Sequence, residues 1–148
     1  MIKIICVGKI KEKYFDLAIK EYQKRISRYT KLEIIELPDY NYDVVKTKNE
    51  EGKNILSKIK EKDYVITLEV EGKHMTSKEL SCFIDKNISN NVTFVIGGSN
   101  GISEEVKRRS DYSLSFSSLT FPHQLFRIIL LEQIYRSFKI INNESYHK

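Results

Sequence analysis

The stretch VTFVIGGSNGISEEV, residues 92–106, shows the pattern of strand, loop and helix that recurs along the chain. Its opening VTFVI is β-branched or aromatic and uncharged, which is typical of a buried strand. Three glycines follow, and then Ser103 with two glutamates behind it. A serine before acidic residues marks a helix start, because the hydroxyl accepts a free N–H and the acids favour the positive helix end. The segment therefore predicts a strand, a glycine loop and a helix in succession.

The same alternation of strand and helix runs along the whole chain. Apolar, β-branched runs occur at residues 2–7, 32–37, 64–70, 92–97 and 112–116. Helical patterns lie near residues 13–29, 44–60, 77–87, 103–110 and 122–140. This order predicts an α/β fold with a mostly parallel sheet and helices on both of its faces. The length of 148 residues, without a linker-like segment, predicts one domain over residues 1–148.

Composition indicates where such a chain resides. Hydrophobic residues make up 41% and charged residues 30%, as in ordinary folded proteins. No run approaches the roughly 20 apolar residues that span a bilayer. The opening MIKIICVGK reads as a first strand and lacks the features of a signal peptide. We expect a cytoplasmic protein with no membrane partner.

The charge of the chain favours polyanionic partners. The formal net charge is +5, and part of the excess is concentrated near the N-terminus. Four basic residues, which we call the basic stripe, recur at helical spacing on one side of residues 14–29 and just beyond: Lys20, Lys24, Arg28 and Lys31. Lys9, Lys11 and Lys13 precede them. Such a stripe suits RNA, but an ordinary solvated helix face has the same pattern.

The last helical pattern is more apolar than one core face requires. Its apolar residues are Leu125, Phe126, Ile128, Ile129, Leu130, Leu131, Ile134, Tyr135, Phe138, Ile140 and Ile141. They cover more than one side of a helix, so packing on a single sheet leaves apolar surface in water. Either a second chain covers that surface or the helix lies centrally in the core, and periodicity alone does not separate these alternatives.

The glycine loop of residues 95–101, VIGGSNG, is a candidate ligand site. In open α/β sheets, ligands bind beyond the carboxyl ends of the strands, and glycines allow the backbone to approach them closely. The loop lacks the Lys-Ser or Lys-Thr of a P-loop, and it is not a G-x-G-x-x-G fingerprint after the first strand. A plain tight turn is the alternative.

Other kinds of chemistry find little support in the sequence. The three histidines have no His or Cys at metal-ligand spacing, and no serine lies in a G-x-S-x-G turn. Cys6 and Cys82 have no C-x-x-C partner, so both are expected to be buried free thiols. We therefore expect no metal, and we expect any chemistry to use an organic cofactor.

Three segments together resemble one family: VIGGSNG at 95–101, SLSFSSLTFPHQLFR at 113–127 and the terminal YHK at 146–148. They are similar to the ribosomal RNA large subunit methyltransferase H family of the SPOUT superfamily. Members of this family methylate N3 of a pseudouridine in large-subunit ribosomal RNA. The resemblance covers the whole chain, including the central ITLEVEGK at 66–73.

The resemblance implies a deep C-terminal trefoil knot, an exception to the rule that protein chains do not thread loops. It also implies a homodimer that holds S-adenosylmethionine in the knot. The cofactor-binding positions that it implies are Leu68, Gly97, Phe116, Ser117, Ser118, Leu119, Thr120 and Phe121. Apolar residues of this set suit the adenine plate, and exposed loop backbone can read its edge.

The implied reaction transfers a methyl group from a sulfonium to a ring nitrogen that must lose its proton. His147 is the expected base, because an unperturbed histidine is partly neutral at pH 7. Tyr146 is expected to position the target base, and Lys148 to contact phosphate. Arg127 stands one helical turn after His123, and we expect it to hold a phosphate or the cofactor carboxylate. His123 is equally compatible with a satisfied buried histidine.

Several alternatives stay open at the level of sequence. The chain could be an RNA-binding or ribosome-associated factor without activity, or a SPOUT methyltransferase that acts on transfer RNA. The sequence does not distinguish free RNA, a ribosomal subunit and the assembled ribosome as substrate, although we expect the ribosome. It also leaves open whether the C-terminal tail acts in its own site or in that of a partner chain.

Overall fold

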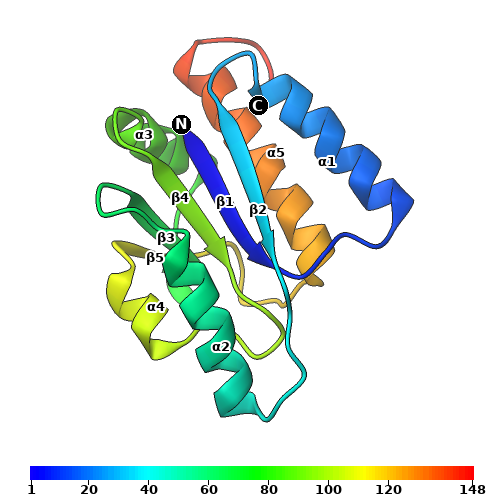
Figure 1. Ribbon diagram of the computed structural model, residues 1–148. Helices are drawn as coiled ribbons and strands as arrows, with labels where there is room; N and C mark the ends of the chain where they lie inside the picture. Colours follow the sequence, from blue (N-terminus) through cyan, green and yellow to red (C-terminus); the bar gives the residue numbers. More distant parts are fainter.

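A computed structural model describes all of residues 1–148 and shows strands and helices in strict alternation (Figure 1). The strands are β1 (Ile2–Val7), β2 (Leu32–Leu37), β3 (Tyr64–His74), β4 (Val92–Ile96) and β5 (Tyr112–Ser115). The helices are α1 (Lys13–Ile26), α2 (Val44–Ser57), α3 (Ser77–Asn87), α4 (Glu104–Arg109) and α5 (His123–Ile141). The main departure from the predicted ranges is β3, which continues past residue 70.

The five strands form one sheet in the order β2-β1-β4-β3-β5, and every neighbouring pair is parallel. The predicted parallel sheet is confirmed. In a parallel sheet the carboxyl ends of all strands lie at one edge, which we call the carboxyl edge. The loops that leave β3, β4 and β5 are therefore brought together there.

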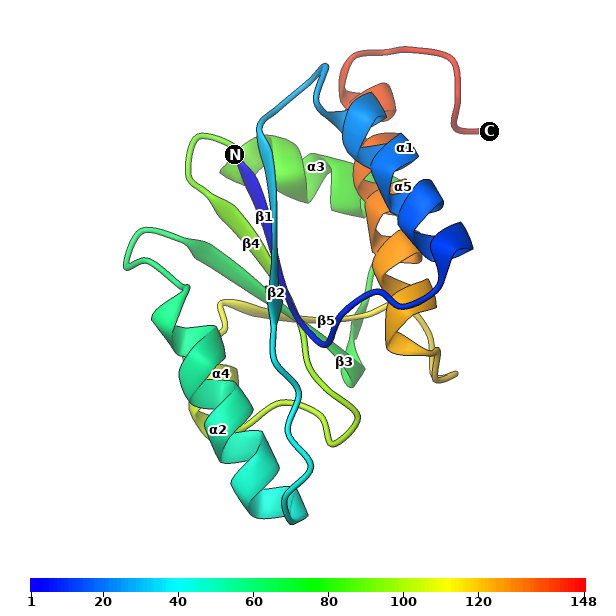
Figure 2. The ribbon, with the colours of Figure 1, turned by 45° about the vertical axis from the view of Figure 1, so that its right-hand side comes forward.

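Helices cover both faces of this sheet, as the alternation predicts (Figure 2). Successive side chains of a strand point to opposite faces, so Ile4 and Cys6 join the cluster under α1, α3 and α5, while Ile5 and Val7 join the cluster under α2 and α4. Because both faces of β1 are buried, its sequence is an almost continuous apolar run. No helix has the length and apolar character needed to cross a bilayer.

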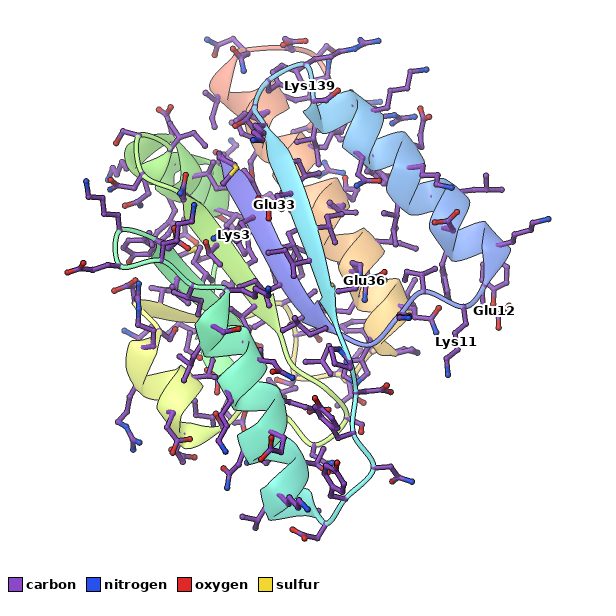
Figure 3. All side chains as sticks on the ribbon, in the orientation of Figure 1. Lys3, Lys11, Glu12, Glu33, Glu36 and Lys139 are labelled. Atoms are coloured by element: carbon purple, nitrogen blue, oxygen red, sulfur yellow. The ribbon has the colours of Figure 1, made fainter.

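The exception within β1 is Lys3, whose side chain is only 3% exposed (Figure 3). Its ammonium donates to Asp63 Oδ2 at 2.8 Å and to the Lys58 carbonyl at 3.0 Å. Burial alone raises the pKa of Asp63, but hydrogen bonds from Lys3, the Lys60 amide and Asn91 outweigh it and hold that pKa below its usual value. The pair fixes the segment that leads into β3.

The apolar helix α5 lies largely in the core, between α1 and α3. Leu130, Leu131 and Ile134 are fully buried there. The central-core alternative therefore accounts for most of its apolar residues, while Leu125 in its first turn remains 36% exposed.

The two cysteines have different environments. Cys6 is 1% exposed, and burial raises the pKa of its thiol to about 11. Cys82 is exposed on α3, so the prediction that both thiols are buried is wrong for Cys82. The reason is helix geometry: Leu80 and Ile84 face the core, and a residue two positions from each lies on the opposite side.

Candidate functional site

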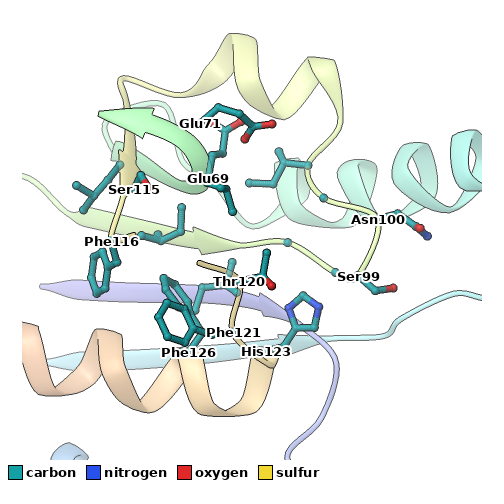
Figure 4. A pocket seen from close by; sticks show the side chains of 18 of the residues that line it. Glu69, Glu71, Ser99, Asn100, Ser115, Phe116, Thr120, Phe121, His123 and Phe126 are labelled. Carbon is teal, nitrogen blue, oxygen red and sulfur yellow. The ribbon is translucent and has the colours of Figure 1, made fainter. Parts of the chain in front are cut away.

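A cavity of about 470 Å³ opens at the carboxyl edge of the sheet (Figure 4). Its walls are the end of β3, the glycine loop after β4, the loop that joins β5 to α5, and the first turn of α5. This volume lies within the range of ordinary small-molecule sites, roughly 300 to 1,000 Å³. The position agrees with the rule that open α/β sheets bind ligands beyond the carboxyl ends of their strands.

The predicted cofactor positions converge on this cavity. Leu68, Gly97, Phe116, Ser117, Leu119, Thr120 and Phe121 all line it. Ser118 is exposed and is absent from the wall. Residues separated by as many as fifty positions in sequence thus share one surface, because β3, β4 and β5 end at the same edge.

The glycine loop presents backbone to the cavity. Gly97 and Gly98 are buried, and Gly101 adopts a left-handed φ of +85° that closes the turn with a hydrogen bond from its N–H to the Gly98 carbonyl at 3.0 Å. A Cβ added to Gly97 would lie 2.8 Å from Ile102 Cγ1, and one added to Gly98 would lie 2.7 Å from Glu51 Oε1. The loop therefore has no room for side chains at these two positions.

Aromatic rings form the apolar wall of the cavity. Phe116 and Phe121 each pack against Phe126 of α5, with ring centroids 5.2 Å and 6.0 Å apart respectively. Leu119 is 70% exposed at the edge of the cavity. Flat apolar walls beside exposed backbone suit a planar ligand with hydrogen-bonding edges.

Four charged side chains also line the cavity, and sequence reasoning missed them as site residues: Lys48, Glu69, Glu71 and Lys107. The available signal for Glu69 and Glu71 was their position directly after Leu68 in ITLEVEGK, at the end of a strand. Lys48 and Lys107 lie in α2 and α4, and nothing local in the sequence connects these helices with the glycine loop.

His123 and Arg127, one helical turn apart, lie in different surroundings. His123 lines the cavity, and burial, followed by the nearby Arg127 charge, lowers its pKa below the usual value. Arg127 is 2% exposed, and its guanidinium donates to Glu36 Oε2 at 2.5 Å and to the Gly8 carbonyl at 3.1 Å. Figure 3 shows Glu36 at the end of β2 beside the start of α5. The structure therefore does not bring Arg127 into the cavity with His123.

The C-terminal tail folds back against the middle of α5. The Tyr146 hydroxyl donates to Glu132 Oε1 at 3.1 Å, and its ring packs edge-on against Tyr135 at 4.9 Å. Burial and the Glu132 charge raise the pKa of Tyr146 to about 12. His147 Nδ1 lies 3.0 Å from Arg136 Nη1. These contacts are with residues in the middle of α5, whereas the cavity is lined by the first turn of this helix and by no residue of the tail.

The contact with Arg136 indicates which ring nitrogen of His147 accepts a hydrogen bond. A guanidinium has donors only, so Nδ1 must accept this hydrogen bond. A neutral ring that accepts this hydrogen bond carries its proton on Nε2.

With this geometry established, comparison with known proteins identifies the family. A family model described as "Predicted SPOUT methyltransferase" matches residues 1–147. The chain belongs to the SPOUT methyltransferase family. Full-length relatives agree: it is 53% identical to "Ribosomal RNA large subunit methyltransferase H 1" of Clostridium perfringens and 55% identical to "Ribosomal RNA large subunit methyltransferase H" of Clostridium botulinum. It is also 55% identical to "Putative ribosomal RNA large subunit methyltransferase H" of Methanococcus vannielii. Each of these alignments covers 99% of both chains.

Family membership confirms the resemblance on which the sequence-based expectations relied, and with it the assignment as a methyltransferase. A SPOUT methyltransferase needs a site for its methyl donor. The cavity at the carboxyl edge has the volume, the aromatic wall and the side-chain-free backbone that a nucleoside-containing donor requires. The structure contains no group of three or more His, Cys, Asp or Glu side chains that could hold a metal ion.

Proposed function

We propose that this protein is an S-adenosylmethionine-dependent methyltransferase that methylates N3 of a pseudouridine in large-subunit ribosomal RNA. The observation that carries the proposal is that the glycine loop and the loop of residues 116–121 line the same cavity. Relatives whose names specify a ribosomal RNA large subunit methyltransferase support the substrate. S-adenosylmethionine, when bound, supplies an electrophilic methyl group on a sulfonium.

The residues of the cavity suit this donor. Leu68, Leu119 and Phe121 are proposed to enclose the adenine, and the backbone of residues 116–121 to read its edge. Gly97 and Gly98 line the cavity without a side chain, and we propose that the main chain lies against the ribose there. The chain's main task is to hold donor and acceptor in line, since positioning alone can contribute about 7 to 11 kcal/mol to a reaction of this kind.

The methyl acceptor is proposed to meet a second chain in this cavity. The tail with Tyr146 and His147 is remote from its own cavity, so we assign it to the cavity of a partner in a homodimer. Exposed apolar side chains near the start of α5 support a partner there: Leu119, Leu125, Tyr14 and Leu17. The starts of α1 and α5 are joined by a 2.9 Å hydrogen bond from the Lys11 amide to Gln124.

Within this composite site, His147 is the proposed base for the N3 proton and Tyr146 the proposed group that orients the target base. The Arg136 contact occupies Nδ1 of His147. To accept the N3 proton at Nδ1, the ring must exchange Arg136 for the substrate. We assign Arg127 a positioning role, since its guanidinium is already bound by Glu36 and the Gly8 carbonyl.

We also propose the trefoil knot of the family for residues near the C-terminus. The loop of residues 116–121 lies against the glycine loop in one cavity before the chain enters α5, which is the juxtaposition that threading requires. Cytoplasmic residence follows from a ribosomal substrate.

RNA binding is proposed to use the exposed basic residues. Lys20, Lys24, Arg28 and Lys31 are all exposed in the structure, as are Lys9, Lys11 and Lys13. We infer recognition by shape and phosphates, with the target presented in the assembled ribosome.

Two experiments test the proposed function. Calorimetry should detect S-adenosylmethionine binding to the folded protein, and no binding at millimolar ligand would favour a non-enzymatic RNA-binding factor. Nucleoside mapping of ribosomal RNA from a deletion strain should show loss of N3-methylpseudouridine, with return of the mark on complementation. Unchanged ribosomal RNA together with a lost transfer RNA methylation would instead point to a transfer RNA substrate.

A further inference from the structure

Glu69 presents a rigid carboxylate in the cavity. Its side chain is 13% exposed, and its Oε2 accepts hydrogen bonds from the Thr67 hydroxyl at 2.9 Å and the Ser113 hydroxyl at 2.6 Å. Thr67 lies in β3 and Ser113 in β5, so two paired strands fix the carboxylate. In contrast, Glu33 of β2 is exposed, lies outside the cavity and makes no side-chain hydrogen bond or ion pair within the chain, which makes it a useful reference.

The other oxygen of Glu69 is available to a ligand. Oε1 accepts no hydrogen bond within the chain, and its nearest charged neighbour is Lys107 Nζ at 3.5 Å. An ionised carboxylate oxygen is a strong acceptor, so a group that donates to it from the cavity gains a charge-assisted hydrogen bond. Because Thr67 and Ser113 already hold the carboxylate in place, little side-chain entropy is lost when a ligand binds.

The charge around Glu69 indicates which kind of donor fits. Lys107 already pairs with Glu69 Oε1 at 3.5 Å and partly offsets its negative charge. A second cation at Oε1 would be repelled by this ammonium, whereas a neutral hydroxyl would not, so the site suits a hydroxyl donor. Glu69 and Leu68, a proposed wall for adenine, both line the cavity from β3, and the ribose is the part of the donor attached to adenine.

We propose that Glu69 Oε1 accepts a hydrogen bond from a ribose hydroxyl of the methyl donor, which makes Glu69 a binding and positioning residue of this enzyme. This inference rests on the proposed use of S-adenosylmethionine. Figure 4 shows Glu69 across the cavity from Phe121 and His123, so an adenosine enclosed by the aromatic wall would present its sugar toward the carboxylate.

The test is calorimetry on the full chain with Glu69→Gln, which keeps an oxygen for Thr67 and Ser113 but replaces the free acceptor by an amide N–H. The ligands are S-adenosylmethionine, S-adenosylhomocysteine, 5′-methylthioadenosine, and the 2′-deoxy and 3′-deoxy forms of S-adenosylhomocysteine. Loss of a hydrogen bond to a charged group predicts about tenfold or greater weakening of the first three ligands, by a similar factor for each. One of the two deoxy ligands should bind wild type more weakly than S-adenosylhomocysteine does, by about the same factor as the loss caused by Glu69→Gln. Its affinity should not fall further in the Glu69→Gln variant.

Glu33→Gln is the matched control, since it makes the same change of charge on an exposed strand residue outside the cavity and should alter each affinity by less than about twofold. Loss confined to ligands that carry the amino-acid group would overturn the proposal and assign Glu69 to the ammonium. Full wild-type affinity for both deoxy ligands would also overturn it, and this measurement does not depend on the variant folding. If wild type binds none of the adenosine ligands, the proposed function itself fails, whereas binding unaffected by Glu69→Gln refutes this inference alone.

Discussion

The contact between Arg127 and Glu36 provides a test of the role of Arg127. The sequence predicts a contact with phosphate or the cofactor, whereas the structure shows the buried guanidinium paired with Glu36. Arg127 is 2% exposed, whereas the Glu36 side chain is 38% exposed. The guanidinium also binds the Gly8 carbonyl, and Glu36 accepts the Ile10 amide at 3.1 Å. The pair thus joins the loop after β1, the end of β2 and the first turns of α5. We predict that Glu36→Gln destabilises the protein more than Arg127→Met.

The asymmetry follows from burial. Removing one partner of a fully buried ion pair costs about 3 to 5 kcal/mol, because the other charge is left uncompensated. Glu36→Gln leaves the buried guanidinium with neutral acceptors only, and the partial exposure of the site reduces the expected loss to about 2 kcal/mol. Arg127→Met removes the buried charge and leaves a carboxylate that water can reach, so we expect about 1 kcal/mol.

Urea unfolding followed by circular dichroism measures both changes. With a slope of about 2 kcal/mol per molar urea, Glu36→Gln should lower the midpoint by about 1 M and Arg127→Met by about half as much. The double variant should resemble Arg127→Met, because the pair is already lost. S-adenosylhomocysteine affinity of Arg127→Met should stay within a few-fold of wild type. A stable Arg127→Met that loses more than tenfold in affinity would refute the positioning role and restore Arg127 as a direct contact.

Three further predictions concern the cavity and the tail. Deletion of Tyr146–Lys148 should abolish methyl transfer in a radiolabel assay while cofactor affinity stays within a few-fold, and equal loss of both would mean that the tail builds the cavity or the fold. Gly97→Val should weaken cofactor binding at least tenfold in calorimetry, since even a Cβ there would meet Ile102 at 2.8 Å, and unchanged affinity would reduce the glycine loop to a turn. Because the folded pKa of His123 is lowered, the unfolded chain takes up a proton first as the pH falls, so stability should decrease below about pH 6.5. His123→Asn should flatten the melting temperature between pH 7 and 5 relative to wild type, and an identical decline in both proteins would assign the effect to another group.

Local chemistry was sufficient to predict most of the secondary structure. Apolar, β-branched runs, helical spacing and capping residues depend only on neighbours in sequence, so strands such as residues 2–7 and 32–37 were predicted with their observed bounds. The end of β3 was missed. Glu69 and Glu71 interrupt its apolar run, and the strand continues to His74 only because it pairs with β5 through an irregular register.

Some residues of the candidate site could likewise be predicted from the sequence, and others could not. The sequence was sufficient to indicate a cofactor site in two loops, at Gly97 and at residues 116–121. The structure places all of these residues except Ser118 around one cavity. Glu69 and Lys107 could not be connected from sequence, because their 3.5 Å approach depends on how α4 packs beside β3.

By itself, the sequence determined the alternation of elements, the glycine loop and the family, since each is written in short segments whose chemistry is local. Only the tertiary structure decided the strand order, the burial of Arg127 against Glu36, the exposure of Cys82 and the position of the tail against the middle of α5. These features depend on contacts between residues as many as 119 positions apart. Such contacts form when the sheet and its two helical layers pack together, and the local preferences of the residues do not determine them.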